Sequence, residues 1–377
     1  MKIKILILVF SLGIQGAFSQ DLDEEINIAG FRFLDYSNQL PENFLSTKAA
    51  VFVTVPPASP QTSERGDWKG LSEKAHRQFK RMGIDAVGYY YMDDLKSGTD
   101  PALFFAAELK KRKIENIILL SRVPLKIKGK PTERFVMVIT PFNGENSFIS
   151  HGQKAWKKQS KELEKVLKEL GKDVYRSKQP KTNFLINDFP EFFEDADAVK
   201  GRRIPTYARD LKVRKLAISK SSLVEIPENR PGGLINKKVE KEIEEYNKKV
   251  VRDNARLESI LKTYPLEYEI VEGKTDKELY DAGFQYVLVK LNTTGTNIRR
   301  MLDYEIDPAE TDFVTVKSKD GRVIIRSIPV NAPIYKYYVK HLYTKDVYVG
   351  TEWDADETWD DALQNFISKM KKDLKLD

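Results

Sequence analysis

The sequence predicts an α/β protein with some α+β character, made of two similar units. Three observations support this. Short apolar runs alternate with stretches whose apolar residues recur every three or four positions, in both halves of the chain. Each half follows the order β-α-β-α-β-β-β-α, and each is expected to close on a helix with Trp in its first turns. The pattern indicates an internal duplication; chance similarity between two ordinary α/β pieces is the alternative.

The first unit opens with the apolar, β-branched run KAAVFVTV, which Pro56-Pro57 ends. A helix from Trp68 should stop at Gly83, and a second should open at Asp100-Pro101, where an N-cap residue precedes proline. The closing helix should carry Trp156 and end at Gly171. Strands are expected at 48–55, 84–92, 115–123, 134–142 and 146–150.

The second unit repeats this order with a long helix near 235–264 and a hairpin at Asp320-Gly321. Its closing helix starts at Trp359. Seven and eleven residues after that Trp come Phe366 and Met370, and Leu163 and Leu167 hold the same places after Trp156, so these groups should share one helix stripe. Strands are expected at 213–219, 266–271, 284–291, 334–343 and 347–350.

The N-terminus has the pattern of a secretory signal peptide. Lys2 and Lys4 precede an apolar stretch of ten residues, too short for a bilayer, which needs about 20. Ala17-Phe18-Ser19 then places small residues where a signal peptidase cleaves, so residues 1–19 should be removed after Ser19. The remaining chain divides into a first domain at 20–172, a packed aromatic linker at 173–212 and a second domain at 213–377.

The composition excludes several classes of function. There is no cysteine, which rules out disulfides, thiol nucleophiles and thiolate metal sites. The net charge of +7 falls to +5 without the two lysines of the leader, and acids and bases are interspersed, so no nucleic-acid partner is expected. No later stretch is apolar enough for a transmembrane span in the mature chain.

The stretch YYYMDDL at 89–95 resembles the metal-binding turn of reverse transcriptases. Polymerase chemistry would need a third carboxylate on a neighbouring strand and an apolar strand returning from the turn. Here Asp93 and Asp94 lead into a helix instead. We therefore expect these two carboxylates to end a half-buried strand and to play no catalytic role.

Two other acidic segments suggest metals at first sight. DYEIDPAETD at 303–312 lacks an EF-hand pattern, because the sixth and twelfth positions are Pro308 and Val314 in place of Gly and Glu. An acidic surface loop is expected there, with a non-standard calcium site as the alternative. WDADETWDD at 353–361 lies where the last helix begins, so its carboxylates are expected to cap free N–H groups and to suit the helix dipole.

No catalytic, cofactor-binding or metal residues are predicted. His76, His151 and His341 lack partners at useful spacing. The chain has no G-x-S-x-G elbow, Walker loop, dinucleotide-binding glycine turn or H-E-x-x-H helix. This leaves only a serine site assembled from distant residues as a nucleophilic possibility.

Two proline-rich loops are candidates for ligand binding. The loops at 54–68 and 221–234 each follow the first strand of their unit, where open α/β sheets bind ligands. Each carries an arginine close to a glutamate: Glu64 and Arg65 in one loop, Glu228 and Arg230 in the other. Stiff, exposed connectors are the alternative.

The long helix is the candidate docking element. A seam of apolar residues runs along it, and about thirty residues give roughly 45 Å, more than a small sheet needs. Its projecting end should meet the linker, another copy or a different protein. The candidate docking residues are Val239, Ile243, Tyr246 and Val250.

This order of elements resembles the small α/β units of bacterial envelope proteins, as in the TolB N-terminal domain family. The resemblance implies an envelope adaptor fold and carries no site residues. We therefore expect an exported, periplasmic, non-enzymatic adaptor or accessory subunit with a protein partner in the cell envelope; the sequence leaves its oligomeric state open. The alternatives are an exported hydrolase of cell-wall or glycan material, using carboxylates from distant segments, and a small-ligand binder.

Overall fold

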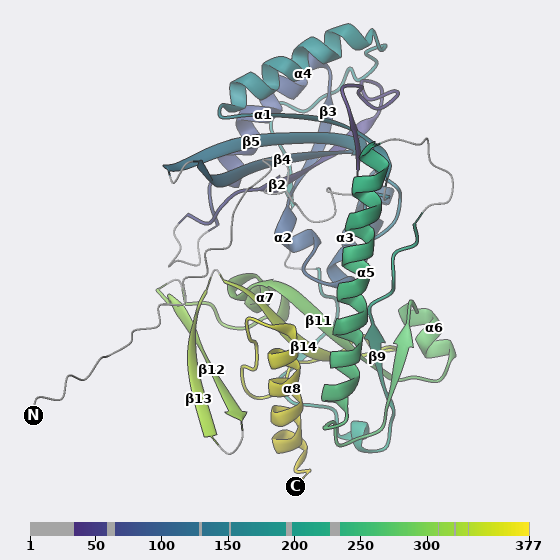
Figure 1. The fold of residues 1–377 in the computed structure, drawn as a ribbon, viewed down its shortest axis with the longest axis vertical. Coiled ribbons are helices and arrows are strands. Elements are labelled where there is room, and N and C mark those ends of the chain that lie inside the picture. Colours follow the sequence, from purple (N-terminus) through teal and green to yellow (C-terminus); the bar gives the residue numbers. More distant parts are fainter. Residues whose placement is uncertain are drawn as a thin grey trace, which may run out of the picture.

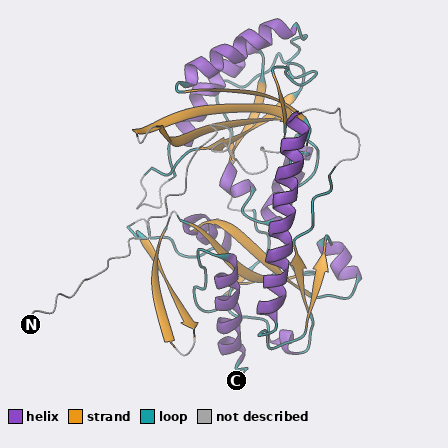
Figure 2. Ribbon diagram, viewed as in Figure 1, coloured by secondary structure: helices purple, strands orange, loops and turns teal. Residues whose placement is uncertain are grey.

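The computed structural model shows two mixed β-sheets with helices on both faces of each, and a separate two-stranded hairpin (Figures 1 and 2). This arrangement confirms the predicted α/β class. The predicted signal peptide lies outside the described residues. These are 34–58, 65–127, 130–150, 152–193, 198–226, 234–307, 309–319, 322–330 and 332–376.

The first sheet has the strand order β1-β6-β5-β4-β2-β3-β7. Its centre is parallel: β2 pairs in parallel with β3 and β4, whereas β5 runs antiparallel to β4, and β6 antiparallel to β5. Short strands complete both edges, with β1 parallel to β6 and β7 parallel to β3. The bounds are β1 Asp35–Ser37, β2 Lys48–Thr54, β3 Asp85–Tyr91, β4 Ile114–Ile127, β5 Lys130–Pro141, β6 Lys154–Ser160 and β7 Phe192–Phe193.

Helices cover both faces of this sheet, because alternate side chains of its apolar strands point to opposite faces. On β2, Val51 and Val53 pack under α1 and α4, whereas Phe52 points to the face that α3 covers. The short α2 and α3 lie on the side that faces the second unit (Figure 1). The bounds are α1 Trp68–Met82, α2 Met92–Leu95, α3 Thr99–Lys111 and α4 Leu163–Ser177.

The second sheet repeats the topology of the first. Its order is β10-β9-β11-β14-β15-β8, so β9, β10, β11, β14, β15 and β8 take the places of β2, β3, β4, β5, β6 and β1. Every strand direction matches as well. The bounds are β8 Arg203–Ile204, β9 Leu216–Lys220, β10 Tyr268–Glu272, β11 Tyr286–Thr294, β14 Pro333–His341 and β15 Val347–Tyr348.

Three helices of the second unit, α5, α6 and α8, take the places of α1, α3 and α4 in the chain order, whereas α7 has no counterpart between β4 and β5. The long α5 and the closing α8 pack on one face of the sheet, and α6 and α7 on the other. The hairpin β12–β13 is inserted between α7 and β14 and stands apart from the main sheet (Figure 2). The bounds are α5 Leu234–Leu261, α6 Asp276–Asp281, α7 Gly295–Leu302, β12 Asp312–Lys319, β13 Arg322–Pro329 and α8 Trp359–Leu374, with a 3₁₀ helix at Arg209–Lys212.

Three predictions about the end of the first unit are wrong. Residues 146–150 form no strand; the third strand of that run is β6, and Trp156 lies on it and not on the closing helix. The helix also continues past Gly171 and past the predicted domain boundary at 172. A glycine inside a helix costs about 1 kcal/mol relative to alanine, and the burial of Leu170 and Val174 on either side offsets this.

The two units contact each other through α2, α3, β11 and β14. The backbone N–H of Asn292 donates to the carbonyl of Ser97 at 2.7 Å. Lys340 of β14 lies between Asp100 of the first unit and Asp276 of the second, and Tyr338 donates to Asp100 at 2.8 Å. These paired, largely buried groups join the units into one body.

Candidate functional site

The acidic motif 89–95 ends at the junction between the two units. Tyr89, Tyr90 and Tyr91 belong to β3, and Met92 begins α2. Asp94 is 1% exposed and receives two hydrogen bonds from the guanidinium of Arg65, at 2.7 and 2.8 Å. The same guanidinium donates to the side-chain oxygen of Asn297 on α7, also at 2.7 Å.

Asp93 and Asp94 therefore lie in a largely buried environment beside the guanidinium of Arg65. Burial raises the pKa of Asp93, opposed by the charge of Arg65 and a hydrogen bond from Tyr91. Arg65, one of the candidate ligand residues, therefore holds a carboxylate of its own chain and a side chain of the second unit. The other three candidates, Glu64, Glu228 and Arg230, lie outside the described residues, so ligand binding by the two loops stays a prediction.

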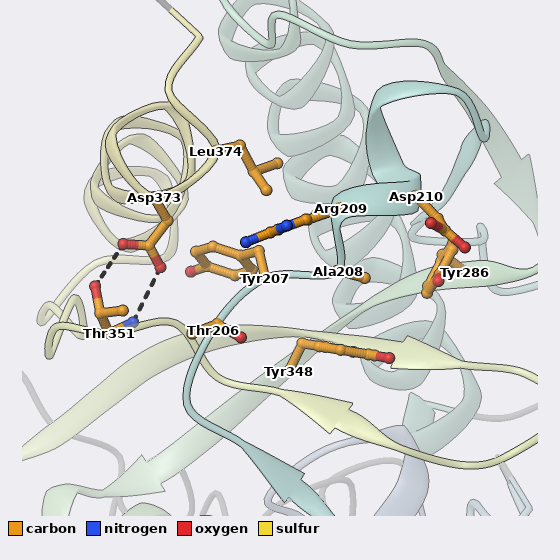
Figure 3. A pocket seen from close by; sticks show the side chains of 10 residues that line it. All are labelled: Thr206, Tyr207, Ala208, Arg209, Asp210, Tyr286, Tyr348, Thr351, Asp373 and Leu374. Carbon is orange, nitrogen blue, oxygen red and sulfur yellow. Dashed lines mark hydrogen bonds between the residues drawn. The ribbon is translucent and has the colours of Figure 1, made fainter.

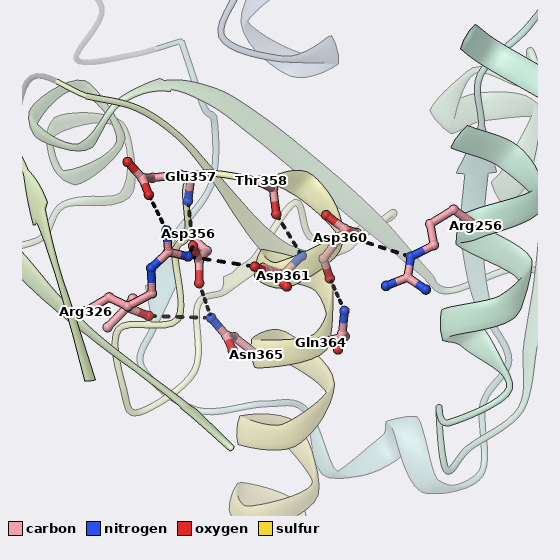
Figure 4. A network of polar contacts seen from close by, with 10 residues as sticks. Arg256, Arg326, Asp356, Glu357, Thr358, Asp360, Asp361, Gln364 and Asn365 are labelled. Atoms are coloured by element: carbon pink, nitrogen blue, oxygen red, sulfur yellow. Dashed lines mark hydrogen bonds and ion pairs between the residues drawn. The ribbon is translucent and has the colours of Figure 1, made fainter. Parts of the chain in front are cut away.

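Arginines bind the acidic cluster at the start of α8 (Figure 4). Arg326 of β13 lies 3.0 Å from Asp356 and 2.5 Å from Glu357. Asn365 donates to the second oxygen of Asp356 at 3.2 Å. No group of three or more potential ligands that could hold a metal ion occurs within the ranges that the structure describes.

The cap of α8 is a threonine and not one of the acids. The hydroxyl of Thr358 accepts from the N–H of Asp361 at 3.3 Å, whereas Asp360 and Asp361 lie in the first turn, where carboxylates suit the helix dipole. Burial works to raise the pKa of Asp360, but hydrogen bonds from Thr358 and Arg256 outweigh it and lower the pKa. The Arg256–Asp360 pair joins α5 to α8 (Figure 4).

The remaining polar candidates also have internal partners. In the loop at 303–312, Glu310 pairs with Arg299 of α7. His76 is buried, with its ring nitrogens 3.0 Å from the hydroxyl of Tyr89 and 3.0 Å from the carbonyl of Asn187. His341 accepts from two backbone N–H groups of its own turn, and His151 lies outside the described residues.

The candidate docking helix is partly covered by its own chain. Ile243 and Val250 are buried, and Val224 and Tyr246 pack against Ile243. The side chain of Val239 lies outside the part of the structure that is described. Figure 1 shows the N-terminal half of α5 extending toward the first unit. Partner docking on this helix stays a prediction. A partner could reach Ile243 and Val250 only by displacing the residues of this chain that bury them.

An exposed apolar surface lies instead on the linker. Phe184, Leu185 and Phe189 are 84%, 94% and 82% exposed; we call these three residues the linker patch. Because large exposed apolar patches commonly mark interaction sites, these three side chains within six residues make the segment a candidate. The aromatic sequence of the predicted linker, 173–212, did not distinguish these outward side chains from those that pack.

Hydrogen bonds on both sides of the patch hold its backbone on the first unit. Ahead of the patch, the N–H of Thr182 donates to the carbonyl of Leu45 at 3.3 Å. Within this stretch Lys80 pairs with Asp188, and behind the patch the N–H of Tyr89 donates to the carbonyl of Glu191 at 2.8 Å. The next two residues, Phe192 and Phe193, form β7 and pack against the tyrosines of β3. The linker patch therefore lies on a fixed support.

The second unit contains a pocket of about 430 Å³ (Figure 3). It is lined by residues 206–210, by Tyr286 of β11 and Tyr348 of β15, and by Thr351 and the last residues of α8. Burial raises the pKa of Tyr286 to about 12, with Tyr348 and Asp210 adding to the effect. No sequence motif marks this pocket, because its lining comes from five separate segments.

No family model, curated protein or solved structure matches this chain. Within the described part of the chain, no helix combines the length and the apolar character needed to cross a membrane.

Proposed function

We propose that this protein is an exported adaptor of the cell envelope that binds a protein partner through the linker patch. The observation that carries the proposal is the exposure of Phe184, Leu185 and Phe189 on a backbone held by hydrogen bonds. A fixed support favours binding, because little conformational entropy is lost when the partner covers the patch. Aromatic side chains, phenylalanine among them, are also enriched in the cores of protein–protein interfaces.

The charges around the patch favour a protein over a lipid surface. Asp188 and Glu191 lie within or beside the patch and pair with Lys80 and Arg112. These carboxylates offset the positive charge that peripheral proteins use to bind anionic headgroups. Apolar residues ringed by both signs of charge match the core and polar rim of a protein–protein interface.

Export is part of the same proposal. It rests on the basic, apolar and small-residue order of residues 1–19, and on the resemblance of the repeated unit to the TolB N-terminal domain family. N-terminal mass spectrometry of the protein from its natural cells should find Gln20 as the first residue. Retention of residues 1–19 in exported protein would contradict the cleavage site.

The docking proposal is tested by a triple variant, Phe184→Ser, Leu185→Ser and Phe189→Ser. Photo-crosslinking in intact cells, followed by isolation of the envelope, should give one partner in near-stoichiometric yield with the parent and none with the triple variant. Val213→Ser with Tyr343→Ser is the matched control, since these side chains are 79% and 73% exposed elsewhere on the molecule. The control should keep the partner.

Two outcomes would overturn the proposal. One is an unchanged crosslinking pattern in the triple variant. The other is co-sedimentation of the parent with vesicles of anionic lipid that the triple variant loses, because this would assign the patch to a membrane surface. The hydrolase alternative stays a prediction, and no observation on the described residues favours it.

A further inference from the structure

The two sheets differ at one edge. In the first sheet β7 covers β3, whereas β10, which takes the place of β3 in the second sheet, pairs only with β9 among the described residues. The other edges end in β1, β7 and β8, with three, two and two residues, but β10 has five. Natural sheets often shorten their edge strands, which prevents pairing with other chains. In the described part of the chain, β10 is therefore the longest open edge.

The pairing with β9 leaves the backbone groups of Tyr268 and Ile270 directed outward. Leu216 of β9 donates to the carbonyl of Glu267 at 3.0 Å, and the register pairs Leu216 with Tyr268. In a parallel ladder the hydrogen bonds to one neighbour come from alternate residues, so the odd-numbered residues of β10 face β9 and the even-numbered residues face outward. Neither Tyr268 nor Ile270 has a backbone hydrogen bond to another described residue on that outer side.

The first unit contains an example of what covers such an edge. The N–H of Tyr89 on β3 points outward in the same way and donates to the carbonyl of Glu191 at 2.8 Å. β7 then runs parallel to β3, and the ring of Phe192 packs against Tyr89 with centroids 5.9 Å apart. Tyr268 and Ile270 lie on the equivalent face of their sheet and are only half-buried. An added strand with large apolar side chains would cover these two residues as Phe192 covers Tyr89.

The charge of this edge favours a different protein over a second copy of the chain. Residues 265–272 contain three glutamates and no lysine or arginine. Glu269 and Glu272 pair with lysines of β9, whereas Glu267 is exposed and has no ion pair with a described residue. A second copy of β10 would bring three more glutamates, and like charges on neighbouring strands destabilise their pairing. The edge therefore suits a segment with a basic residue near Glu267.

We propose that β10 binds an extended segment of a second protein, which adds to the sheet as a parallel strand. Carbonyls of the segment accept hydrogen bonds from the outward N–H groups of Tyr268 and Ile270. Its large apolar side chains cover these two residues, and its basic residue lies near Glu267. In this mode of binding, backbone hydrogen bonds supply affinity and alternate side chains supply specificity. The surface is separate from the linker patch, which belongs to the first unit.

Photo-crosslinking in intact cells tests the proposal. The photoreactive residue p-benzoylphenylalanine replaces Tyr268 in one protein and Ile270 in another, and mass spectrometry maps each adduct. Both positions should form adducts with one segment of one partner. Because side chains on the same face of a strand are two residues apart, the adduct from position 270 should lie two residues closer to the partner's C-terminus than the adduct from position 268.

A proline variant tests the backbone contacts. Ile270→Pro removes one outward N–H and leaves the ladder with β9 intact, and proline is tolerated on edge strands. It should lower the yield of the adduct from position 268 by about tenfold, because a hydrogen bond and the close approach of the segment are lost. Ile270→Thr is the matched control, since threonine keeps the N–H and suits a strand. The control should retain most of the adduct.

A charge variant tests the same edge without changing the strand. Glu267→Lys should also lower the yield of the adduct from position 268, because it places a positive charge beside the basic residue of the segment. Glu305→Lys is the matched control: it changes the net charge equally at another exposed position of the second unit. Thermal midpoints close to that of the parent will show that each variant is folded.

The proposal is overturned if neither position gives an adduct with another protein, or if the adducts join two copies of this chain. Adducts on unrelated segments, or in the reverse order along one segment, would also overturn it. So would a parent-like yield in folded Ile270→Pro or in Glu267→Lys. None of these outcomes bears on the linker patch, which lies on the other unit and is tested with its own variants.

Discussion

Arg65 and Asp94 form a two-point ion pair, with hydrogen bonds of 2.7 and 2.8 Å to the two carboxylate oxygens. The carboxylate belongs to the motif that resembles a polymerase site, and the same arginine contacts Asn297 of the second unit. The pair therefore assigns Asp94 a structural role at the junction.

Asp94→Ala should lower the free energy of unfolding by about 3–5 kcal/mol, because it leaves a largely buried guanidinium without its main partner. Urea denaturation measures the change. Glu162→Ala is the control: it removes an exposed pair with Lys165 and should cost less than about 1 kcal/mol. Equal losses in both variants would contradict the role assigned to the junction pair.

Trp156 and Trp359 should differ in their contributions to stability. Trp156 is fully buried on β6 and donates to Asp173 at 2.9 Å, so Trp156→Ala should cost about 3–5 kcal/mol. Trp359 is the first residue of α8 and only partly buried, so its truncation should cost clearly less. The measurement is the shift of the urea midpoint at constant slope. A loss for Trp359→Ala that equals the loss for Trp156→Ala would refute this ranking.

The fold was largely predictable where strands are buried on both faces. The parallel strands β2, β3, β4 and β11 are nearly continuous apolar runs, a pattern that indicates central strands directly. β6 was missed because its sequence KAWKKQS buries only Ala155 and Trp156, and the lysines around them suit a helix equally well. β1 and β7 are too short to produce any periodicity.

The candidate sites were less predictable, because tertiary packing decides which side chains point outward and which segments meet. Nothing in NFLINDFPEFF separates Phe189, which points outward, from Phe192, which packs against Trp68. The pocket depends on Arg209 meeting Tyr348, and the two are brought together only when β8 pairs with β15.

Glu352 should make stability sensitive to acid. Hydrogen bonds from Lys369 and Lys372 lower its pKa from 4.5 to about 2. A pKa depressed in the folded state stabilises the fold fully above pH 4.5, and this contribution is lost as the pH falls toward 2. The free energies of unfolding of the parent and Glu352→Gln should therefore differ near neutral pH and converge over that interval.

Urea unfolding at a series of pH values measures this difference. Glu305→Gln is a useful control, since the side chain of Glu305 is exposed and has no ion pair with the described residues. A difference between parent and Glu352→Gln that stays constant down to pH 2 would contradict the depressed pKa.

The strand β7 should depend on Phe193. Its ring stacks on Tyr90 with centroids 4.9 Å apart, and the guanidinium carbon of Arg112 lies 4.0 Å from the ring centroid. Phe193→Ala should loosen β7 and speed hydrogen exchange at the amide of Tyr89, which donates to Glu191. Exchange in β9 should stay unchanged, because that strand lies in the other sheet.

The matched control for this experiment is Phe189→Ala, since that ring is 82% exposed. It should leave the exchange rate of the Tyr89 amide as it is in the parent. Equal acceleration in both variants would show that the linker loosens as a whole and that the stacked ring has no special role.

The junction also has a consequence for the order in which the chain folds as it emerges from its N-terminus. Asn297 follows Arg65 by 232 positions. The first unit is complete only at β7, which ends at Phe193, so at about 5–20 residues per second roughly 5–20 seconds pass before its junction partner Asn297 emerges. During that interval the face with α2 and α3 is uncovered, at a time when the strands of the second unit are emerging. Because both sheets share one strand order, a nascent β11 resembles the β4 that is already in place. Early closure of the Arg65–Asp94 pair within the first unit would hold that face in its final form until the second unit arrives, and so limit pairing between equivalent strands of the two units.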